Sequence, residues 1–432
     1  MADELRLSIE KLVYGGDGLA HADGNTVFVP YVLPGEEVRA AVKKRQKKLL
    51  RADLLEVIFP GKERGKPSCP HFQKCGGCHY QHISAAEQLR LKKEILRETL
   101  SRLGGISWDG PIREHAAEPY GYRNRAQWAV RGGMPRALGY FLPKSSLILP
   151  IDLCPVLSPL LAGTFLKLQE MARSGTLPAQ AQELEAFADS RDENIALNVA
   201  FEKFPKPVAE LTSAFHNALP QLASLLLLDQ RKNRFELSGT GYLTQDVGGY
   251  QYRVSHLSFF QVNRFLIRDL LDTVVENARG ELALDLYAGV GFFGIALAKS
   301  FGKIVSVDAN LAATRDLQAN AELAGVSIVS HNEHAEEFLK KTKERPEFVV
   351  LDPPRAGLGA QAAKHLAELK PREIVYLSCD PSTLARDLAV LTNSARKSDE
   401  PSNRYEITEM HLFDLFPQTF HIETLVRLRK SP

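Results

Sequence analysis

Four short, β-branched runs in the C-terminal part of the chain restrict its fold more than any other feature. They are LALDLYAG, IVSVDAN, FVVLDPP and IVYLSCDP, and helix-length stretches separate them from about residue 256 onward. This alternation predicts a doubly wound, mostly parallel sheet, which binds ligands at the carboxyl ends of its strands. Each run ends near a residue that can do chemistry: Asp285, Asp308, Asp352 and Cys379. We therefore expect an active site along this edge of the sheet.

The first run continues into a glycine-rich turn. Gly289, Gly291 and Gly294 form a Gly-x-Gly-x-x-Gly pattern, and Asp308 follows at the end of the next predicted strand. Glycines let a ligand approach the backbone closely, and a strand-end acid can accept hydrogen bonds from ribose hydroxyls. NAD and S-adenosylmethionine both carry a ribose, so this segment alone does not separate them. Turn glycines without a ligand are the structural alternative.

Three other residues are candidates for the chemistry. Asp352 leaves its strand into a rigid Pro-Pro pair, which favours an acid that points into the ligand crevice. Cys379 precedes a Pro-Ser-Thr helix start, whose dipole would favour a thiolate nucleophile over a buried apolar cysteine. Glu423 lies in the strand-like run HIETL. If it faces the crevice, burial would raise its pKa and suit it to accept a proton; otherwise it is a surface residue of an edge strand.

The five cysteines of the chain are unevenly spaced. Three fall within CPHFQKCGGC, at Cys69, Cys75 and Cys78, and Cys154 follows far downstream in DLCPVL. Four thiolates can bind zinc, but zinc ribbons use two close pairs, and here Cys154 stands alone. An iron–sulfur cluster accepts three close ligands and a remote one, and a proline after the last ligand is familiar there. The spacing favours a cluster over zinc.

The remaining sequence indicates two further regions. Residues 4–58 combine short alternating runs with glycine-rich turns, which predict a small β-barrel. Ten Lys and Arg side chains between Arg39 and Lys66, against three acidic ones, are typical either of a solvated face or of a phosphate-binding surface. Residues 83–105 have helical periodicity and end on a glycine pair, and residues 106–250 mix short strands with one or two helices. Residues 394–404 read as an exposed loop.

The bulk properties exclude several classes of protein. A net charge of +2 and 44% hydrophobic residues are ordinary for a globular chain. The N-terminal residues lack the order of a signal peptide, and no apolar run approaches the roughly 18–20 residues that span a bilayer. We therefore expect a cytoplasmic protein with reduced thiols and no membrane partner.

Together these motifs resemble the RNA uracil-C5 methyltransferases, which make 5-methyluridine, and the resemblance covers essentially the whole chain. It implies an α/β fold in three parts. Residues 1–60 would be an OB-like TRAM barrel that binds RNA. The segments that carry this resemblance are GGDGLAH and VPYVLPGEEV. Residues 61–255 would be a central α+β iron–sulfur region whose helix 83–105 packs on the catalytic domain. Residues 256–432 would be a Rossmann-like class I methyltransferase domain.

The resemblance also implies a role for each candidate residue. S-adenosylmethionine would be bound by Gln261 of SFFQVNRF, Tyr287, Gly289, Gly291, Asp308 and Asp352. Cys379 of LSCDPSTLARDL would be the nucleophile that adds to uracil C6, Glu423 of HIETL the general base, and Asp352 the residue that orients base and cofactor. The [4Fe-4S] ligands would be Cys69, Cys75, Cys78 and Cys154.

The substrate follows less directly. Transfer-RNA members of the family generally lack the barrel and the cluster, so the resemblance favours 23S ribosomal RNA over transfer RNA. The sequence does not indicate the oligomeric state, and a monomer is the default expectation. The chain departs from the family pattern at Ala288 and Phe292, where many members carry Cys and Asn or Thr. This departure leaves a non-catalytic RNA-binding assembly factor as an alternative.

Overall fold

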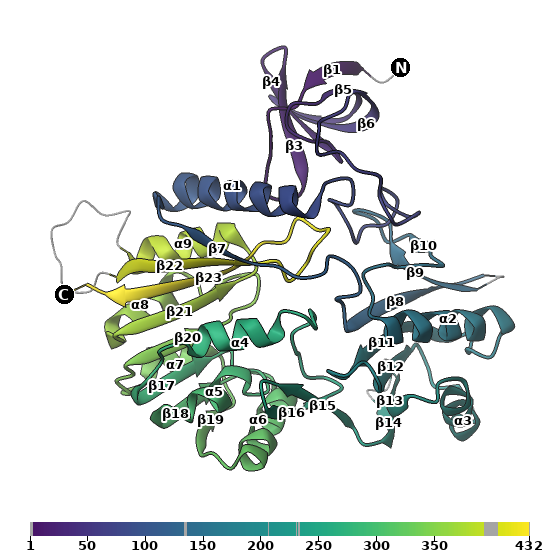
Figure 1. Cartoon of the computed structure of the whole chain (residues 1–432). Coiled ribbons are helices and arrows are strands. Elements are labelled where there is room, and N and C mark those ends of the chain that lie inside the picture. Colours follow the sequence, from purple (N-terminus) through teal and green to yellow (C-terminus); the bar gives the residue numbers. More distant parts are fainter. Residues whose placement is uncertain are drawn as a thin grey trace.

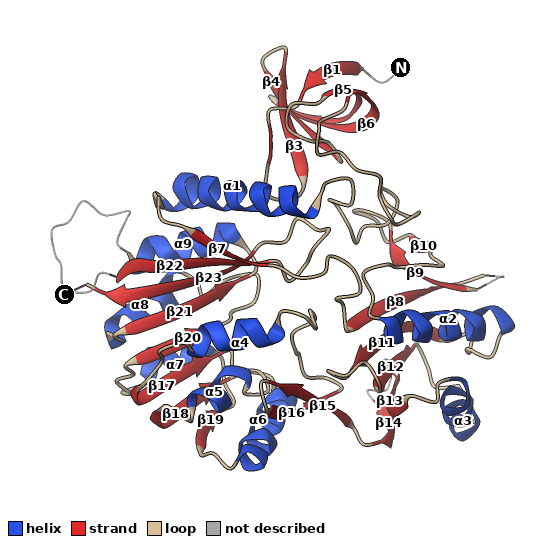
Figure 2. Cartoon of the chain, viewed as in Figure 1, coloured by secondary structure: helices blue, strands red, loops and turns tan. Residues whose placement is uncertain are grey.

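The computed structural model describes residues 3–133, 136–205, 207–229, 231, 234–392 and 405–431. The predicted loop 394–404 lies outside the described residues. Figure 1 shows three groups of elements: a small sheet at the top, a mixed sheet at the right and a larger sheet at the left. Figure 2 shows that helices flank the two larger sheets, whereas the small sheet consists of strands and loops.

The N-terminal group is a six-stranded sheet in the order β1-β5-β6-β4-β3-β2. Its strands are β1 (Glu4–Ser8), β2 (Lys11–Leu12), β3 (Asp17–Ala22), β4 (Asn25–Pro30), β5 (Glu37–Gln46) and β6 (Leu49–Phe59). Alternate side chains such as Leu7, Val27, Val29 and Val38 turn inward and form a separate small core. The predicted strand-rich domain is therefore present.

Helix α1 (Ala85–Gly104) lies under the N-terminal sheet (Figure 1). Ser84 caps its N-terminus by accepting a hydrogen bond from the Glu87 N–H, and Gly105, at φ +63°, ends it in the left-handed conformation. The α1 backbone approaches α9 (Pro381–Leu391) so closely that a Cβ on Gly104 would lie 2.7 Å from the carbonyl oxygen of Ala385. Helix α1 thus packs on α9 and contributes to one of the two cores of the larger sheet.

The central region contains a seven-stranded sheet in the order β10-β9-β8-β11-β12-β13-β14. Its elements are β8 (Arg125–Arg131), β9 (Ala137–Phe141), β10 (Ile148–Pro150), α2 (Pro159–Ser174), β11 (Ala181–Ala188), β12 (Ile195–Phe201), α3 (Val208–Ala218), β13 (Leu222–Asp229) and β14 (Arg234–Gly239). A core that includes Trp128, Phe165 and Phe215 joins the helices to the sheet. The region is α+β.

The C-terminal group is an eight-stranded sheet in the order β19-β18-β17-β20-β21-β23-β22-β7. Its strands are β17 (Gly280–Leu286), β18 (Phe301–Val307), β19 (Ile328–His331), β20 (Phe348–Leu351), β21 (Glu373–Ser378), β22 (Tyr405–Phe413), β23 (Glu423–Lys430) and β7 (Ile112–His115). The four runs singled out in the sequence are β17, β18, β20 and β21, and they pair in parallel. The predicted doubly wound sheet is confirmed.

Helices cover both faces of this sheet and create its two cores. They are α4 (Ile267–Val275), α5 (Phe292–Leu297), α6 (Leu311–Ala324), α7 (Ala335–Lys341), α8 (Ala360–Leu369) and α9. Strand β23 runs antiparallel to β21 and carries Glu423 at its first position, beside the end of β21. Among the described residues, no helix is long and apolar enough to cross a membrane.

One strand and one hairpin that precede residue 256 also pack with the C-terminal sheet. Strand β7 pairs in parallel with β22 at the sheet edge. Strands β15 (Tyr242–Val247) and β16 (Tyr250–Ser255) form a hairpin that packs into the core containing α4 and α5. There the Tyr252 hydroxyl donates to the Phe292 carbonyl at 2.9 Å. Residues before and after position 256 therefore pack into the same cores. A domain boundary at residue 256 stays a prediction.

Candidate active site

The turn after β17 is held by the acid that ends β18. Asp308 accepts a hydrogen bond from the Gly289 N–H at 2.8 Å and another from the Asn310 N–H at 2.7 Å. Gly289 and Gly291 have φ of +53° and +86°, a region where a side chain is strained. The structure therefore brings together the glycine turn and the acid that the sequence assigned to ribose binding, and Asp308 remains partly exposed.

Asp285 lies behind this turn and is almost completely buried. It accepts a hydrogen bond from the Gly294 N–H at 2.9 Å, and a Cβ on Gly294 would lie 2.9 Å from the same oxygen, so any larger residue here would displace the Asp285 side chain. Burial raises the pKa of Asp285 to about 8, and the charges of Asp308 and Asp352 contribute to the increase. Asp285 thus couples the glycine turn electrostatically to the end of β20.

Tyr287 occupies the first position after β17 in a left-handed conformation, with φ +58°. This conformation is unusual for a residue other than glycine and clusters at functional sites. Its hydroxyl donates to Glu336 at 2.8 Å, and its ring packs against one core of the large sheet. The half-buried ring is next to the glycine turn, as expected of an aromatic residue beside a cofactor, and that role stays a prediction.

Gln261, Asp352 and Glu423 line one small cavity at the ends of β20 and β23. The Gln261 amide donates to Asp352 at 3.3 Å. Burial raises the pKa of Asp352 to about 6 and that of Glu423 to about 8, with the Asp352 charge adding to the second shift. The prediction that burial raises the pKa of Glu423 is confirmed. The cavity, about 10 Å³, holds at most a single water, so a larger ligand must open it.

Cys379 follows the last residue of β21 and is partly exposed. Burial raises the pKa of its thiol to about 12, and the negative charges of Glu423 and Asp352 add to the increase, whereas Arg355 opposes it. The thiol, the two carboxyl groups and Gln261 therefore form one electrostatically coupled group at adjacent strand ends. In the ligand-free protein the thiol is protonated at neutral pH, so it must lose its proton before it can act as a nucleophile.

The expected help from the helix dipole is not available to the thiol. The N-cap of α9 is Asp380, whose Oδ1 accepts hydrogen bonds from the N–H groups of Ser382 at 2.8 Å and Thr383 at 3.3 Å. A carboxylate therefore occupies the positive end of the helix, in the place that the sequence suggested for the thiolate. The prediction that the α9 dipole lowers the thiol pKa is wrong, because Cys379 lies one residue outside the cap.

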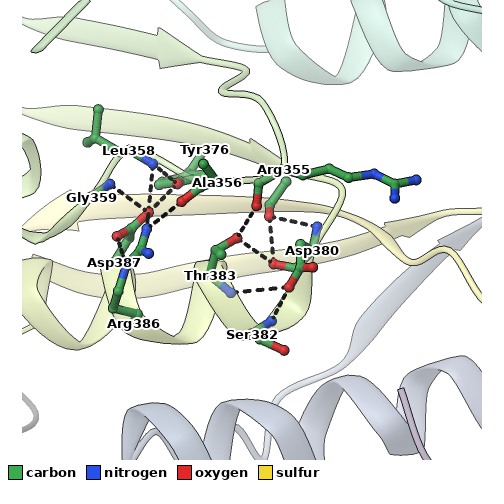
Figure 3. A network of polar contacts seen from close by, with 11 residues as sticks. Arg355, Ala356, Leu358, Gly359, Tyr376, Asp380, Ser382, Thr383, Arg386 and Asp387 are labelled. Carbon is green, nitrogen blue, oxygen red and sulfur yellow. Dashed lines mark hydrogen bonds and ion pairs between the residues drawn. The ribbon is translucent and has the colours of Figure 1, made fainter. Parts of the chain in front are cut away.

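A second set of contacts fixes the loop that carries Asp352 (Figure 3). The buried Asp387 accepts hydrogen bonds from the Tyr376 hydroxyl at 2.7 Å and from the N–H groups of Leu358 at 2.8 Å and Gly359 at 3.3 Å. The loop after β20 is thus tied to α9, the helix that follows Cys379. The loop that carries Cys379 and the loop that carries Asp352 are therefore both attached to α9.

The four remaining thiols lie together, away from Cys379. Cys69, Cys75, Cys78 and Cys154 line a single cavity of about 60 Å³, although Cys154 is far from the others in sequence. Burial raises the pKa of each, to about 12 for Cys78 and about 11 for Cys154. Within the described part of the chain, no set of three or more His, Cys, Asp or Glu side chains is arranged to hold a single metal ion. The structure therefore shows that the four thiols share a cavity. An iron–sulfur cluster at this place stays a prediction.

Comparison with known proteins supports this organisation at both ends of the chain. A family model described as tRNA (Uracil-5-)-methyltransferase matches residues 239–431, and one described as TRAM domain matches residues 3–55. An RNA methyltransferase of Aquifex aeolicus is 33% identical and covers 98% of both chains. The chain belongs to the RNA uracil-C5 methyltransferase family. The predicted enzyme class and the TRAM domain are thereby confirmed.

Two relatives of this methyltransferase differ in their RNA. The 23S rRNA (uracil(1939)-C(5))-methyltransferase RlmD of Alkalilimnicola ehrlichii is 30% identical over 99% of this chain and 97% of its own. The crystal structure of Pyrococcus abyssi tRNA (uracil-54, C5)-methyltransferase, in complex with S-adenosyl-L-homocysteine, has a TM-score of 0.76 and 26% identity, and the match covers 98% of this chain and 100% of that chain. A transfer-RNA enzyme thus spans the N-terminal region too. The N-terminal domain therefore does not by itself separate the two substrates, and the preference for 23S ribosomal RNA stays a prediction.

The methyltransferase site also contains residues to which the sequence analysis gave no role. Arg355, three residues after Asp352, lies 3.2 Å from the His421 ring, and its positive charge offsets part of the rise in the pKa values of Cys379 and Glu423. Figure 3 shows its guanidinium extended away from the Asp387 contacts. The motif LDPPRAGL contained the signal, because an arginine so soon after a strand-end acid is well placed to reach the same crevice.

Proposed function

We propose that this enzyme methylates C5 of a uridine in 23S ribosomal RNA through a covalent adduct between Cys379 and uracil C6. The observation that carries the proposal is the coupling of one thiol to two carboxyl groups, Asp352 and Glu423, at adjacent strand ends. A thiol nucleophile with a carboxyl group of raised pKa beside it is the pair that addition to a ring and later proton removal require.

The chemistry assigns a separate task to each side chain. The Cys379 sulfur forms a bond to C6 of the uracil, and the electron pair of the C5–C6 double bond moves into an enolate that makes C5 nucleophilic. S-adenosylmethionine supplies the methyl group when bound. Glu423 then removes the proton from C5, the double bond re-forms, and the sulfur leaves C6. The nearby guanidinium of Arg355 opposes the rise in the thiol pKa and so favours the thiolate.

The cofactor would lie along the edge formed by β17, β18 and β20. Asp308, which keeps an exposed face, would accept hydrogen bonds from the ribose, and the backbone at Gly289 and Gly291 would allow close approach. Tyr287 would flank the cofactor, and Gln261 and Asp352, already hydrogen-bonded to each other, would orient its reacting end and the base.

The RNA would approach from the N-terminal domain. A cleft of about 800 Å³ lies between this domain and the cysteine-rich segment, and Arg51, Lys74, Lys144, Tyr31 and Phe420 are among its lining residues. Cationic and aromatic side chains together bind single-stranded RNA through its phosphates and its bases. In an RNA helix the neighbouring bases stack on the target uracil and shield its C5 and C6. The uridine would therefore be flipped out of its strand to reach Cys379.

The identity of the RNA can be tested directly. We expect the purified protein to transfer a labelled methyl group to 23S rRNA that lacks 5-methyluridine and to leave unmodified transfer RNA unlabelled, with the modified uridine located by mapping. Transfer RNA is the second candidate, because the Pyrococcus abyssi enzyme matches the whole chain. Labelling of transfer RNA alone would establish that candidate. RNA binding without labelling of either substrate would indicate a non-catalytic binding protein.

We further propose that Cys69, Cys75, Cys78 and Cys154 hold a [4Fe-4S] cluster. Four thiolates on one zinc at about 2.3 Å must be nearly in contact with one another, whereas a cluster separates its ligands. The four thiols share one cavity, and their spacing in the sequence, three close together and one remote, favours the cluster over zinc. The cluster would join the segment 69–78 to the central region and shape the RNA-binding cleft.

We expect protein purified without oxygen to contain about four iron atoms per chain. Cys154→Ser should lose most of this iron, because a serine hydroxyl is a poor ligand for iron and the other three thiols lie on a different segment. Cys379→Ser is the matched control and should keep its iron. Iron content and absorption spectra measure the result without any assay of activity. Zinc in place of iron, or equal iron in both variants, would contradict the cluster.

A further inference from the structure

The glycine-rich turn between β2 and β3 brings the N-terminal domain onto the catalytic loop. In this turn the Gly16 N–H donates to the Val13 carbonyl at 3.2 Å. Gly15 and Gly16 have φ of +106° and +92°, a conformation that costs little only for glycine. The two glycines therefore set the direction of the turn and of Tyr14, which precedes them.

The turn also packs closely on the rest of the protein. A Cβ on Gly16 would lie 3.3 Å from the Cβ of His79 and 3.4 Å from that of Phe420. The rings of Tyr14 and Phe420 meet edge to face, with centroids 5.7 Å apart. Phe420 stands three residues before Glu423, so the turn is in contact with the segment that leads to the proposed base.

The Tyr14 hydroxyl reaches the nucleophile loop itself. It lies 3.3 Å from the carbonyl oxygen of Cys379 and 3.2 Å from Oδ2 of Asp380, both hydrogen-bond acceptors. The other carboxylate oxygen of Asp380 caps α9. Asp380 is thus held by the helix on one side and by Tyr14 on the other, and the same hydroxyl also contacts the backbone of Cys379.

We propose that Tyr14 is a positioning residue for Cys379, and that its hydroxyl makes the geometry of the nucleophile loop depend on docking of the N-terminal domain. The inference rests on the proposed nucleophilic role of Cys379. Its physical basis is that addition to C6 requires the sulfur in a narrow range of positions, and that Tyr14 adds a contact to the Cys379 backbone beyond those of Ser378 and the α9 cap. An RNA-binding domain that supplies this contact links binding of the substrate to alignment of the thiol.

Tyr14→Phe tests the proposal, because it keeps the ring and its contact with Phe420 and removes only the hydroxyl. RNA with 5-fluorouridine at the target position isolates the step: after C5 is methylated it has no proton to lose, so the Cys379–C6 bond persists. We expect the single-turnover rate of adduct formation to fall about tenfold, as the loss of one hydrogen bond predicts. The Kd values for RNA and S-adenosylmethionine should stay within about twofold.

Tyr405→Phe is the matched control. Its hydroxyl also donates to a backbone carbonyl, that of Pro371 at 2.9 Å, but near the opposite end of β21 from Cys379. This variant should form the adduct at the wild-type rate. An unchanged rate in Tyr14→Phe, or a loss explained by weaker RNA binding, would overturn the positioning role and leave the proposed function intact. Failure of the wild-type protein to form any adduct would instead refute the proposed function.

Discussion

Cys379→Ala should abolish methylation, with a fall in kcat of at least about 10³-fold, while RNA and cofactor binding stay within about twofold. In the proposed mechanism this sulfur makes uracil C5 nucleophilic, and the other four cysteines line a separate cavity, so none of them can replace it. Alanine removes only one partly exposed sulfur, and the loop remains supported by Asp380 and the α9 cap. Single-turnover transfer of a labelled methyl group measures the loss.

The matched comparison for this variant is Cys154→Ser, which removes a thiol from the other cavity. If the Cys154 cavity takes no part in the chemical step, the Cys154→Ser protein that still binds RNA should transfer methyl groups at the wild-type rate. Turnover by Cys379→Ala at more than about a hundredth of the wild-type rate would contradict covalent catalysis by this residue. Melting temperatures of both variants exclude unfolding as the cause.

Glu423→Gln should slow turnover by about 10²- to 10⁴-fold and accumulate a protein–RNA adduct. The amide keeps the shape of the side chain but cannot take the C5 proton, so the reaction stops after methylation, with the sulfur still bonded to C6. A denaturing gel of protein incubated with labelled RNA and S-adenosylmethionine reveals the adduct. Glu406→Gln is the control, because Glu406 is exposed on β22 and contacts only the Ser431 hydroxyl among the described interactions. Normal turnover without an adduct in Glu423→Gln would exclude the base role.

The same residue predicts how the wild-type rate varies with pH. Burial, with the charge of Asp352, raises the pKa of Glu423 to about 8. A base acts in its ionised form, which is the minor form below this pKa and the major form above it, so the rate at which the methylated adduct resolves should rise with pH through about 8. Glu423→Gln should lose this rise in its residual adduct-resolving rate. A wild-type rate independent of pH between 7 and 9 would show that another group removes the proton.

The catalytic sheet could be predicted because its signals are local. Each strand carries its own β-branched run, and parallel strands place their ends at one edge, so Asp308, Asp352 and Cys379 were identified without knowledge of any long-range contact. Glu423 could not be placed in this way, because the sequence alone left it either in the crevice or on an edge strand. The antiparallel pairing of β23 with β21 puts it beside the end of β21.

The features that the sequence did not reveal depend on contacts between distant segments. Strand β7 pairs with β22 across almost three hundred residues, and four residues of strand carry no periodicity from which to infer this partner. Tyr14 reaches Cys379 only through the docking of two domains. The helix-dipole argument failed by one residue: the motif SCDPS contains both a thiol and a better capping group, and the carboxylate of Asp380 took the cap.

The place of β7 in the sheet has a consequence for how the chain can be divided. The polypeptide enters the catalytic sheet at residues 112–115, leaves it to form the central region, and returns at β17. A fragment that begins at residue 256 would leave β22 as an unpaired edge and strip α1 from the apolar surface beneath it, and both exposures promote aggregation. The central region is in effect an insertion, so removing it and rejoining its ends is a more natural way to obtain a minimal catalyst than truncation from the N-terminus.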